Sequence, residues 1–348
     1  MSWLKKLFGS KNPETEITQP QRDSKRDSPP KKRADKRFSG YTSSVHSLAF
    51  SPNSQRLASG HRAGDISLWN FESGQVLRSL QGHTDTIVSL AFSPDGFYLA
   101  SGSYDSTARI WEVETGREIC ALQANVDQGP DLKADVLVAF SPDGNLLTTG
   151  SLNVKLWDAK TSGEIQVLPE WDEPGGDKRV AALRFSSDGE TLAVGATKSG
   201  HVQHYKIPEG TKLRRVDPIQ KIGGGIVWAL AFAADLKTFA WGFNWRGGNW
   251  VKLWEIDSER ELCTLAATHE RGLISHITFS PDDKRIAAAD VAGKVRHWDI
   301  FTKRELSITR RTGRVYAVEF SPDGQTMAYA GEERTIGFIQ NWIGRKKK

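Results

Sequence analysis

A five-residue turn sequence is repeated seven times along this chain at nearly even spacing. Full copies of Phe-Ser-Pro-Asp-Gly begin at Phe92, Phe140 and Phe320, and weaker copies begin at Phe50, Phe185, Phe232 and Phe279. Successive copies lie 41 to 48 residues apart. A fixed period of this size indicates one supersecondary unit copied along the chain, and so small a unit cannot bury its own apolar face. The chain must therefore fold as an array of mutually dependent units.

Each repeat predicts four short strands. An alternating apolar run such as Ile87, Leu90 and Phe92 precedes the turn, and a period of two is typical of a half-buried strand. In the turn, proline presets φ, aspartate can bond to its own main chain and glycine accepts a positive φ. A second strand follows the turn, a third ends at an aromatic residue such as Trp111, and a fourth is more polar. Four antiparallel strands in about 45 residues predict one propeller blade.

The repeats resemble those of the WD-repeat family over roughly residues 38 to 342. The resemblance rests on the pairs Gly82-His83, Trp157-Asp158 and Trp298-Asp299. It implies an all-β fold, a seven-bladed β-propeller of four-stranded antiparallel blades. We expect three segments: a disordered basic extension over 1–37, the propeller over 38–342 and a basic tail over 343–348.

The family resemblance also implies a buried hydrogen-bonded relay within a blade. Its members are a histidine, a serine of the second strand, a turn aspartate and the tryptophan. At the family's positions only the second blade has all four, namely His83, Ser101, Asp105 and Trp111. Elsewhere Tyr41 replaces the histidine, Ala63 and Ala292 replace the aspartate, and Tyr205 and Ile339 replace the tryptophan.

The last repeat is short of one strand. After its third strand, at 335–339, nine residues remain, too few for a turn and a paired fourth strand. We therefore predict that a segment at about 33–39 supplies the missing strand and closes the ring. Closure removes exposed strand edges, which otherwise invite aggregation.

The positive charge of the chain lies in its ends. Residues 1–37 carry eleven Lys and Arg against five Asp and Glu, a net of +6, and Arg345–Lys348 add +4. Subtracting both from the chain's net charge of +5 leaves −5 for the propeller. The basic balance therefore says little about the partners of the propeller itself.

The first eight residues have an amphipathic pattern. On a helix, Trp3, Leu4, Leu7 and Phe8 share one face, with Lys5 and Lys6 opposite, as in an interfacial membrane anchor. The alternative is a frayed terminus, because two helical turns are marginally stable alone. The C-terminal basic run would add attraction to an anionic leaflet, or it is simply a solvated tail.

The sequence predicts a cytoplasmic protein. A peripheral contact with a membrane is a further expectation. It has no run of about 18 apolar residues and no apolar core of a signal peptide at its N-terminus. The two cysteines, Cys120 and Cys263, fall in outer strands of different blades, too far apart to bridge, which fits a reducing compartment.

No sequence motif argues for catalysis. Neither standard glycine-rich phosphate loop occurs, nor does a nucleophile elbow. His201 and His204 are three apart in a strand pattern, which puts them on opposite faces and spoils a shared metal site. We therefore predict no catalytic residue, cofactor, metal or small-molecule substrate.

Docking of partner proteins is the function that the resemblance implies. In the WD-repeat family, the loops between blades and the turns between second and third strands surround the mouth of the channel, the usual docking surface. Trp, Tyr and Arg dominate binding hot spots. Residues of these kinds, with one lysine, predicted to bind partners there are Arg62, Tyr104, Arg179, Lys198, Trp228, Trp245, Arg314 and Tyr316. For any one of them the alternative is packing, or exposure without a partner.

The predicted function is a non-catalytic protein–protein interaction scaffold. The alternative is a nucleic-acid-associated propeller, whose basic tails bind phosphates and whose aromatic rim stacks bases. The location of positive charge discriminates between them. A basic stripe on the propeller favours nucleic acid, whereas charge confined to the tails favours lipid contact or solvation.

Overall fold

The structure, a computed structural model, describes residues 37–40, 43–124, 134–169, 179–217, 226–245, 248–268 and 272–340. Within these residues the chain forms seven four-stranded antiparallel sheets, which confirms the predicted all-β, seven-bladed fold. Several residues singled out from the sequence lie outside the described ranges: Trp3, Leu4, Leu7, Phe8 and Tyr41, together with the basic run at 345–348.

Each blade is one sheet, with its strands given from the innermost outward. Blade 1 comprises β2 (Val45–Phe50), β3 (Arg56–His61), β4 (Ile66–Asn70) and β5 (Val76–Leu80). Blade 2 comprises β6 (Ile87–Phe92), β7 (Tyr98–Ser103), β8 (Thr107–Glu112) and β9 (Glu118–Gln123). Blade 3 comprises β10 (Leu137–Phe140), β11 (Leu146–Gly150), β12 (Val154–Asp158) and β13 (Glu164–Val167).

The remaining four blades repeat this arrangement. Blade 4 comprises β14 (Val180–Phe185), β15 (Thr191–Ala196), β16 (Val202–Lys206) and β17 (Thr211–Val216). Blade 5 comprises β18 (Ile226–Phe232), β19 (Thr238–Trp245), β20 (Gly248–Glu255) and β21 (Arg260–Thr268). Blade 6 comprises β22 (Ile274–Phe279), β23 (Arg285–Asp290), β24 (Lys294–Asp299) and β25 (Glu305–Arg310). Blade 7 comprises β26 (Val315–Phe320), β27 (Thr326–Gly331), β28 (Ile336–Gln340) and β1 (Arg37–Phe38).

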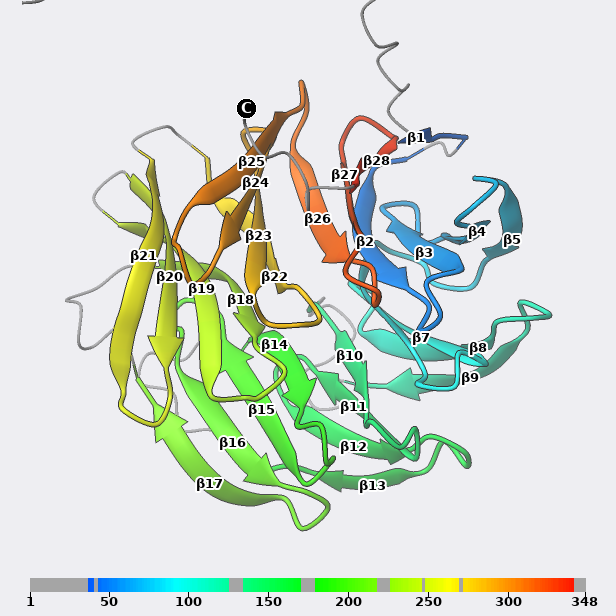
Figure 1. Cartoon of the computed structure of the whole chain (residues 1–348). Helices are drawn as coiled ribbons and strands as arrows, with labels where there is room; N and C mark the ends of the chain where they lie inside the picture. Colours follow the sequence, from blue (N-terminus) through cyan, green and yellow to red (C-terminus); the bar gives the residue numbers. More distant parts are fainter. Residues whose placement is uncertain are drawn as a thin grey trace, which may run out of the picture. The chain divides into compact units, whose positions relative to one another are not determined.

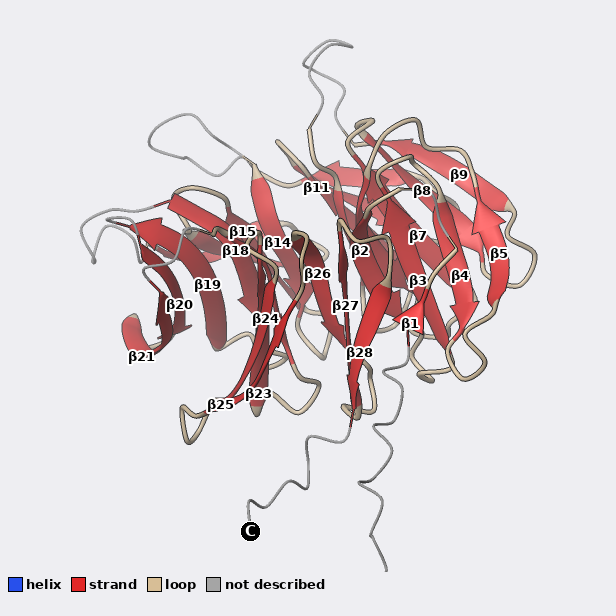
Figure 2. Ribbon diagram, turned by 90° about the horizontal axis from the view of Figure 1, so that it is seen from above, coloured by secondary structure: helices blue, strands red, loops and turns tan. Residues whose placement is uncertain are grey.

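The blades form a closed ring around a central channel (Figure 1). The innermost strand of each blade contacts the innermost strand of the next, and β26 of blade 7 contacts β2 of blade 1. In the view turned by 90° about the horizontal axis, the strands of neighbouring blades stand side by side (Figure 2). Seven clusters of buried apolar side chains lie between successive blades. The core is thus divided among the interfaces.

The predicted closure of the ring is confirmed. β1 pairs antiparallel with β28, with Phe38 opposite Ile336. Phe38 is 3% exposed, and its ring centroid lies 4.7 Å from that of Phe338 and 5.3 Å from that of Trp69 in blade 1. One short strand from the N-terminal side therefore both completes blade 7 and packs against blade 1.

The repeated turn has the same backbone in every copy. A backbone hydrogen bond joins the first and the fourth residue after the phenylalanine. In blade 2, for example, Gly96 N donates to Ser93 O at 2.9 Å. The fourth residue has a positive φ in all seven copies: Ser54 (58°), Gly96 (76°), Gly144 (73°), Gly189 (77°), Leu236 (51°), Asp283 (52°) and Gly324 (66°). This left-handed conformation explains why glycine is the commonest residue there.

The turn serine has a structural role that the spacing alone does not reveal. Ser93 Oγ accepts a hydrogen bond from Tyr98 N at 2.9 Å and donates one to Asp95 Oδ1 at 2.5 Å. Five other copies, beginning at Phe50, Phe140, Phe185, Phe279 and Phe320, make the same backbone contact. In these six copies the serine therefore ties the first residue of the turn to the start of the second strand.

Neighbouring turns touch one another around one end of the ring, which we call the turn end. A Cβ placed on Gly96 would lie 3.6 Å from Pro52 Cδ of the preceding blade, and one on Gly144 would lie 3.4 Å from Pro94 Cδ. Blade 5 has Ala234 in place of proline, which adds a backbone N–H. Asp283, in the glycine position of blade 6, accepts a hydrogen bond from that N–H at 2.9 Å. The two departures from the repeat compensate each other.

Replacing Phe38 with alanine tests the importance of closure. A fully buried phenylalanine cut to alanine costs about 3–5 kcal/mol. We expect Phe38→Ala to lower the free energy of unfolding, measured by chemical denaturation, by about 3 kcal/mol. The exposed neighbour changed in Ser39→Ala is the control. Equal unfolding midpoints for Phe38→Ala and the wild type would show that β1 is dispensable.

Candidate functional site: the channel mouth

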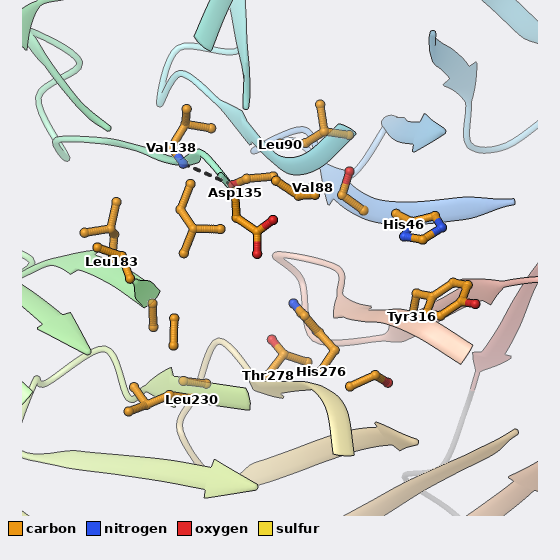
Figure 3. Close-up of a pocket in the computed structure, with 18 of the residues that line it drawn as sticks. His46, Val88, Leu90, Asp135, Val138, Leu183, Leu230, His276, Thr278 and Tyr316 are labelled. Atoms are coloured by element: carbon orange, nitrogen blue, oxygen red, sulfur yellow. Dashed lines mark hydrogen bonds between the residues drawn. The ribbon is translucent and has the colours of Figure 1, made fainter. Parts of the chain in front are cut away.

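A cavity of about 410 Å³ occupies the end of the channel opposite the turns. It is lined by side chains from the innermost strands of all seven blades (Figure 3). We call this opening the channel mouth. Because no single blade could form it, its chemistry depends on residues far apart in the sequence.

A β-bulge places one side chain of each of six inner strands at the mouth. The pairing register shifts across one residue, four positions before the repeat phenylalanine, and a bulge of this kind re-aims the side chain that it carries. The bulge residues are His46, Val88, Ala181, Trp228, Ser275 and Tyr316, and all six line the cavity. The backbone feature is constant, whereas the side chain differs from blade to blade.

Three of these bulge residues are aromatic. Trp228 is 47% exposed at the mouth. Tyr316 of blade 7 stacks on His46 of blade 1, with ring centroids 4.2 Å apart and 16° between the planes (Figure 3). Burial, reinforced by the positive charge of Arg62, lowers the pKa of His46 to about 4, so this ring is neutral at physiological pH. The mouth therefore offers flat, uncharged surfaces.

A polar cluster joins blades 2, 3 and 4 at the same mouth. The Tyr104 hydroxyl donates a hydrogen bond to the Asp135 carboxylate, and Arg179 lies close enough to act on both. Burial and the negative charge of Asp135 raise the pKa of Tyr104 to about 12. Burial also raises the pKa of Asp135, against the hydrogen bond from Tyr104 and the charge of Arg179.

The cavity brings together three of the residues predicted to bind partners, namely Tyr104, Trp228 and Tyr316. The predicted basic residues Arg62, Arg179, Lys198 and Arg314 are exposed outside its lining. Trp245 ends β19, and its side chain lies outside what the structure describes. Asp135, which the sequence did not single out, points into the cavity toward His276 (Figure 3).

Two ionisable residues deeper in the channel were not predicted from the sequence. The residue before each repeat phenylalanine is Ala49, Ala91, Ala139, Arg184, Ala231, Thr278 or Glu319. Arg184 and Glu319 line both the mouth cavity and a second cavity of about 400 Å³ at the turn end. They therefore lie at the boundary between the two. The sequence does carry a signal that could have revealed these two residues. Each is charged at a position where four other copies have alanine.

The channel environment keeps Glu319 protonated over an unusually wide pH range. Removal from bulk water raises the pKa of Glu319 to about 8, although the charge of Arg184 and a hydrogen bond with Thr278 oppose the shift. His276, nearby in the lining, donates a hydrogen bond from Nδ1 to Val318 O at 3.0 Å, and burial lowers the pKa of this histidine. The middle of the channel thus holds one cation and an acid that is largely neutral at pH 7.

The relay expected in blade 2 is present in the structure. His83 lies 2.8 Å from Asp105 through Nδ1 and 2.8 Å from Ser101 through Nε2. Trp111 Nε1 donates to the same Ser101 hydroxyl at 2.8 Å. The hydrogen bonds from His83 and Thr107, opposing the effect of burial, hold the pKa of Asp105 well below its usual range. The relay fixes the loop entering blade 2 to the blade itself.

Blade 1 contains a second relay, built from other positions, that the sequence pattern did not predict. In blade 1, His61 Nε2 lies 2.9 Å from Ser59 Oγ, and Trp69 Nε1 donates to that hydroxyl at 2.9 Å. His61 Nδ1 lies 2.6 Å from Asp65 Oδ2. The aspartate is two residues later than Ala63, and the histidine comes from the blade's own second strand. Because the histidine and the aspartate both stand at new positions, the hydrogen bond between them is retained.

The described residues contain no candidate metal centre. None of them forms a cluster of three or more His, Cys, Asp or Glu side chains able to hold a metal ion. Cys120 and Cys263 are free thiols. The parts of the chain that the structure describes contain no helix long and apolar enough to cross a membrane.

The fold and the channel mouth define the class of the protein, a WD-repeat β-propeller. Residues 44–340 match the family model described as the IFT122 first beta-propeller, and the chain belongs to this family. The chain is also 26% identical over 196 residues to Protein groucho of Drosophila melanogaster. That match covers 56% of this chain and 26% of the relative, so it spans about a quarter of the relative's length. Propellers of this class generally serve as protein-interaction scaffolds.

The raised pKa of Glu319 predicts a pH-dependent loss of stability. In the unfolded chain Glu319 ionises near its ordinary pKa of 4.5, whereas in the folded protein it retains its proton to about pH 8. Stability is therefore full below pH 4.5 and is lost as the pH rises through this window. We expect Glu319→Gln to gain a few degrees of melting temperature over the wild type between pH 5 and pH 9.

Thermal denaturation at several pH values measures this difference, with Glu190→Gln on the exposed turn end as the control. A constant offset between Glu319→Gln and the wild type at all pH values would contradict the assignment.

Proposed function

We propose that this protein is a non-catalytic scaffold that docks partner proteins on its channel mouth. The observation that carries the proposal is the set of six bulge side chains held at one opening, with Trp228 47% exposed among them. Exposed aromatic and arginine side chains around a concave surface are typical of binding hot spots. The rigid ring presents them without a cost for ordering the backbone.

The chemistry of the mouth indicates the kind of partner segment. Aromatic surfaces from Trp228 and the Tyr316–His46 pair favour an apolar or aromatic anchor. The exposed cations Arg62, Arg179 and Arg314 favour carboxylates or backbone carbonyls around that anchor. A short partner segment with an apolar centre and acidic flanks meets both requirements.

Replacing Trp228 tests the docking site. Loss of a central aromatic hot spot typically costs 2 kcal/mol or more, so we expect Trp228→Ala to weaken partner binding by roughly thirtyfold. Partners captured by the wild-type protein are identified first, and their affinities for each variant are then measured by calorimetry. Phe301→Ala is the matched control, because Phe301 is 75% exposed in the turn between β24 and β25, at the opposite end. Equal affinities for Trp228→Ala and the wild type would place docking elsewhere.

We further propose that the N-terminal segment holds the cytoplasmic protein at anionic membranes. The pattern of Trp3, Leu4, Leu7 and Phe8 beside Lys5 and Lys6 supports this role.

Flotation on anionic vesicles tests the membrane contact. We expect the full chain to float at low salt and to dissociate as salt is raised, because the basic residues contribute a screened attraction. A chain lacking residues 1–8 is expected to remain in the soluble fraction. If both remain soluble at low salt, the membrane contact does not exist.

A further inference from the structure

The two cavities of the channel meet at a shared set of residues. Six side chains line both the mouth cavity and the cavity at the turn end, namely Leu48, Leu90, Val138, Leu183, Arg184 and Glu319. We call this set the channel waist. Its four aliphatic members come from blades 1 to 4, each two positions before a repeat phenylalanine. The waist therefore combines an apolar wall with two ionisable groups.

Arg184 and Glu319 reach the waist from opposite sides of the channel. Arg184 is in β14 of blade 4 and Glu319 is in β26 of blade 7, three blades apart in the ring. The positive charge of Arg184 nevertheless acts on the Glu319 carboxyl group, and Thr278 of blade 6 forms a hydrogen bond with that group. Thr278 lies across the cavity from Leu90 and Val138 (Figure 3). Three polar groups thus converge inside the channel.

The Arg184 guanidinium group is available to a ligand. In the part of the chain that the structure describes, it donates no hydrogen bond and forms no ion pair. None of its nitrogen atoms is sealed within the protein without a partner, so these donors reach the open space of the channel. A partly enclosed cation without a paired anion favours the binding of one.

Glu319 leaves that positive charge uncompensated at neutral pH. Removal from water keeps its carboxyl group largely protonated at pH 7, because the pKa is raised to about 8. A protonated carboxyl group can donate a hydrogen bond, and so can the hydroxyl of Thr278. The waist thus has one positive charge and two neutral donors beside an aliphatic surface.

We propose that the channel waist binds a small organic acid, as a ligand and not as a substrate. Its carboxylate would take a bidentate pair of hydrogen bonds from Arg184, and its short aliphatic chain would pack against Leu48, Leu90 and Val138. One cation matches one carboxylate better than it matches a phosphate, which carries more charge. The two cavities, of about 410 and 400 Å³, have the size and the mostly apolar lining of small-molecule sites. This site does not depend on docking of proteins at the channel mouth.

Titration of the full chain with sodium hexanoate tests the proposal. Nuclear magnetic resonance follows the methyl signals of the waist leucines and the Nε–Hε signal of Arg184, which is assigned by its absence from Arg184→Ala. We expect saturable shifts with a dissociation constant on the order of 1 mM, as for a ligand of this size. Hexanol, which lacks the charge, and acetate, which lacks the chain, should each bind at least about tenfold more weakly.

Matched variants identify the binding group. Arg184→Ala introduces the residue already present at the equivalent positions Ala49, Ala91, Ala139 and Ala231, so the inner strand tolerates it. This variant should weaken hexanoate binding at least about tenfold, because it removes a charge-assisted pair of hydrogen bonds. Arg78→Ala, which removes an exposed arginine from the outermost strand β5, is the control and should bind hexanoate like the wild type.

Three results would overturn the proposal. The first is equal affinity of Arg184→Ala and the wild type for hexanoate. The second is equal affinity of the wild type for hexanoate and hexanol, which would show that the charge is not read. The third is the absence of hexanoate binding together with weaker partner binding by Arg184→Ala, which would assign the carboxylate to a docked protein.

Discussion

The structure depends on apolar contacts between neighbouring blades. Each buried cluster draws side chains from two successive sheets, so a blade removed from the ring would expose both of its faces. Such an arrangement is stable only if the two ends of the array also meet. Phe38 does this at the interface between blades 7 and 1, where it packs with Trp69 and Phe338. A two-residue strand therefore has an importance that its length does not suggest.

The repeats are alike at one end of the ring and differ from one another at the other end. At the turn end the repeated sequence specifies one backbone conformation, and neighbouring turns fit against each other through small and rigid residues. Where one copy departs from the pattern, its neighbour departs as well, as Ala234 and Asp283 show. At the channel mouth the backbone bulge is repeated but its side chain is not, so His46, Trp228 and Tyr316 differ from Val88 at equivalent sites. Function is expected where the repeats are free to differ.

The channel also shows how a shared environment changes the chemistry of single residues. Glu319 follows the same strand pattern as Ala49, but in the ring its carboxyl group faces a narrow space shared with Arg184. Removal from water is the largest effect on its pKa, and the nearby cation offsets only part of it. Burial likewise lowers the pKa of His46 at the mouth, so its ring is neutral and available for stacking.

The sequence alone determined the fold of this protein, because a seven-fold repeat of strand and turn signals admits few architectures. It also predicted the closing strand, since the last repeat lacked one, and the His83–Asp105 relay. It could not predict the relay of blade 1, because His61 and Asp65 stand at other positions than the family's relay residues, and only the structure shows that they are hydrogen-bonded. Nor could it pair Arg184 with Glu319, or Tyr104 with Asp135 and Arg179. These groups come from different blades, and only the packing of the blades into a ring brings them close enough to interact.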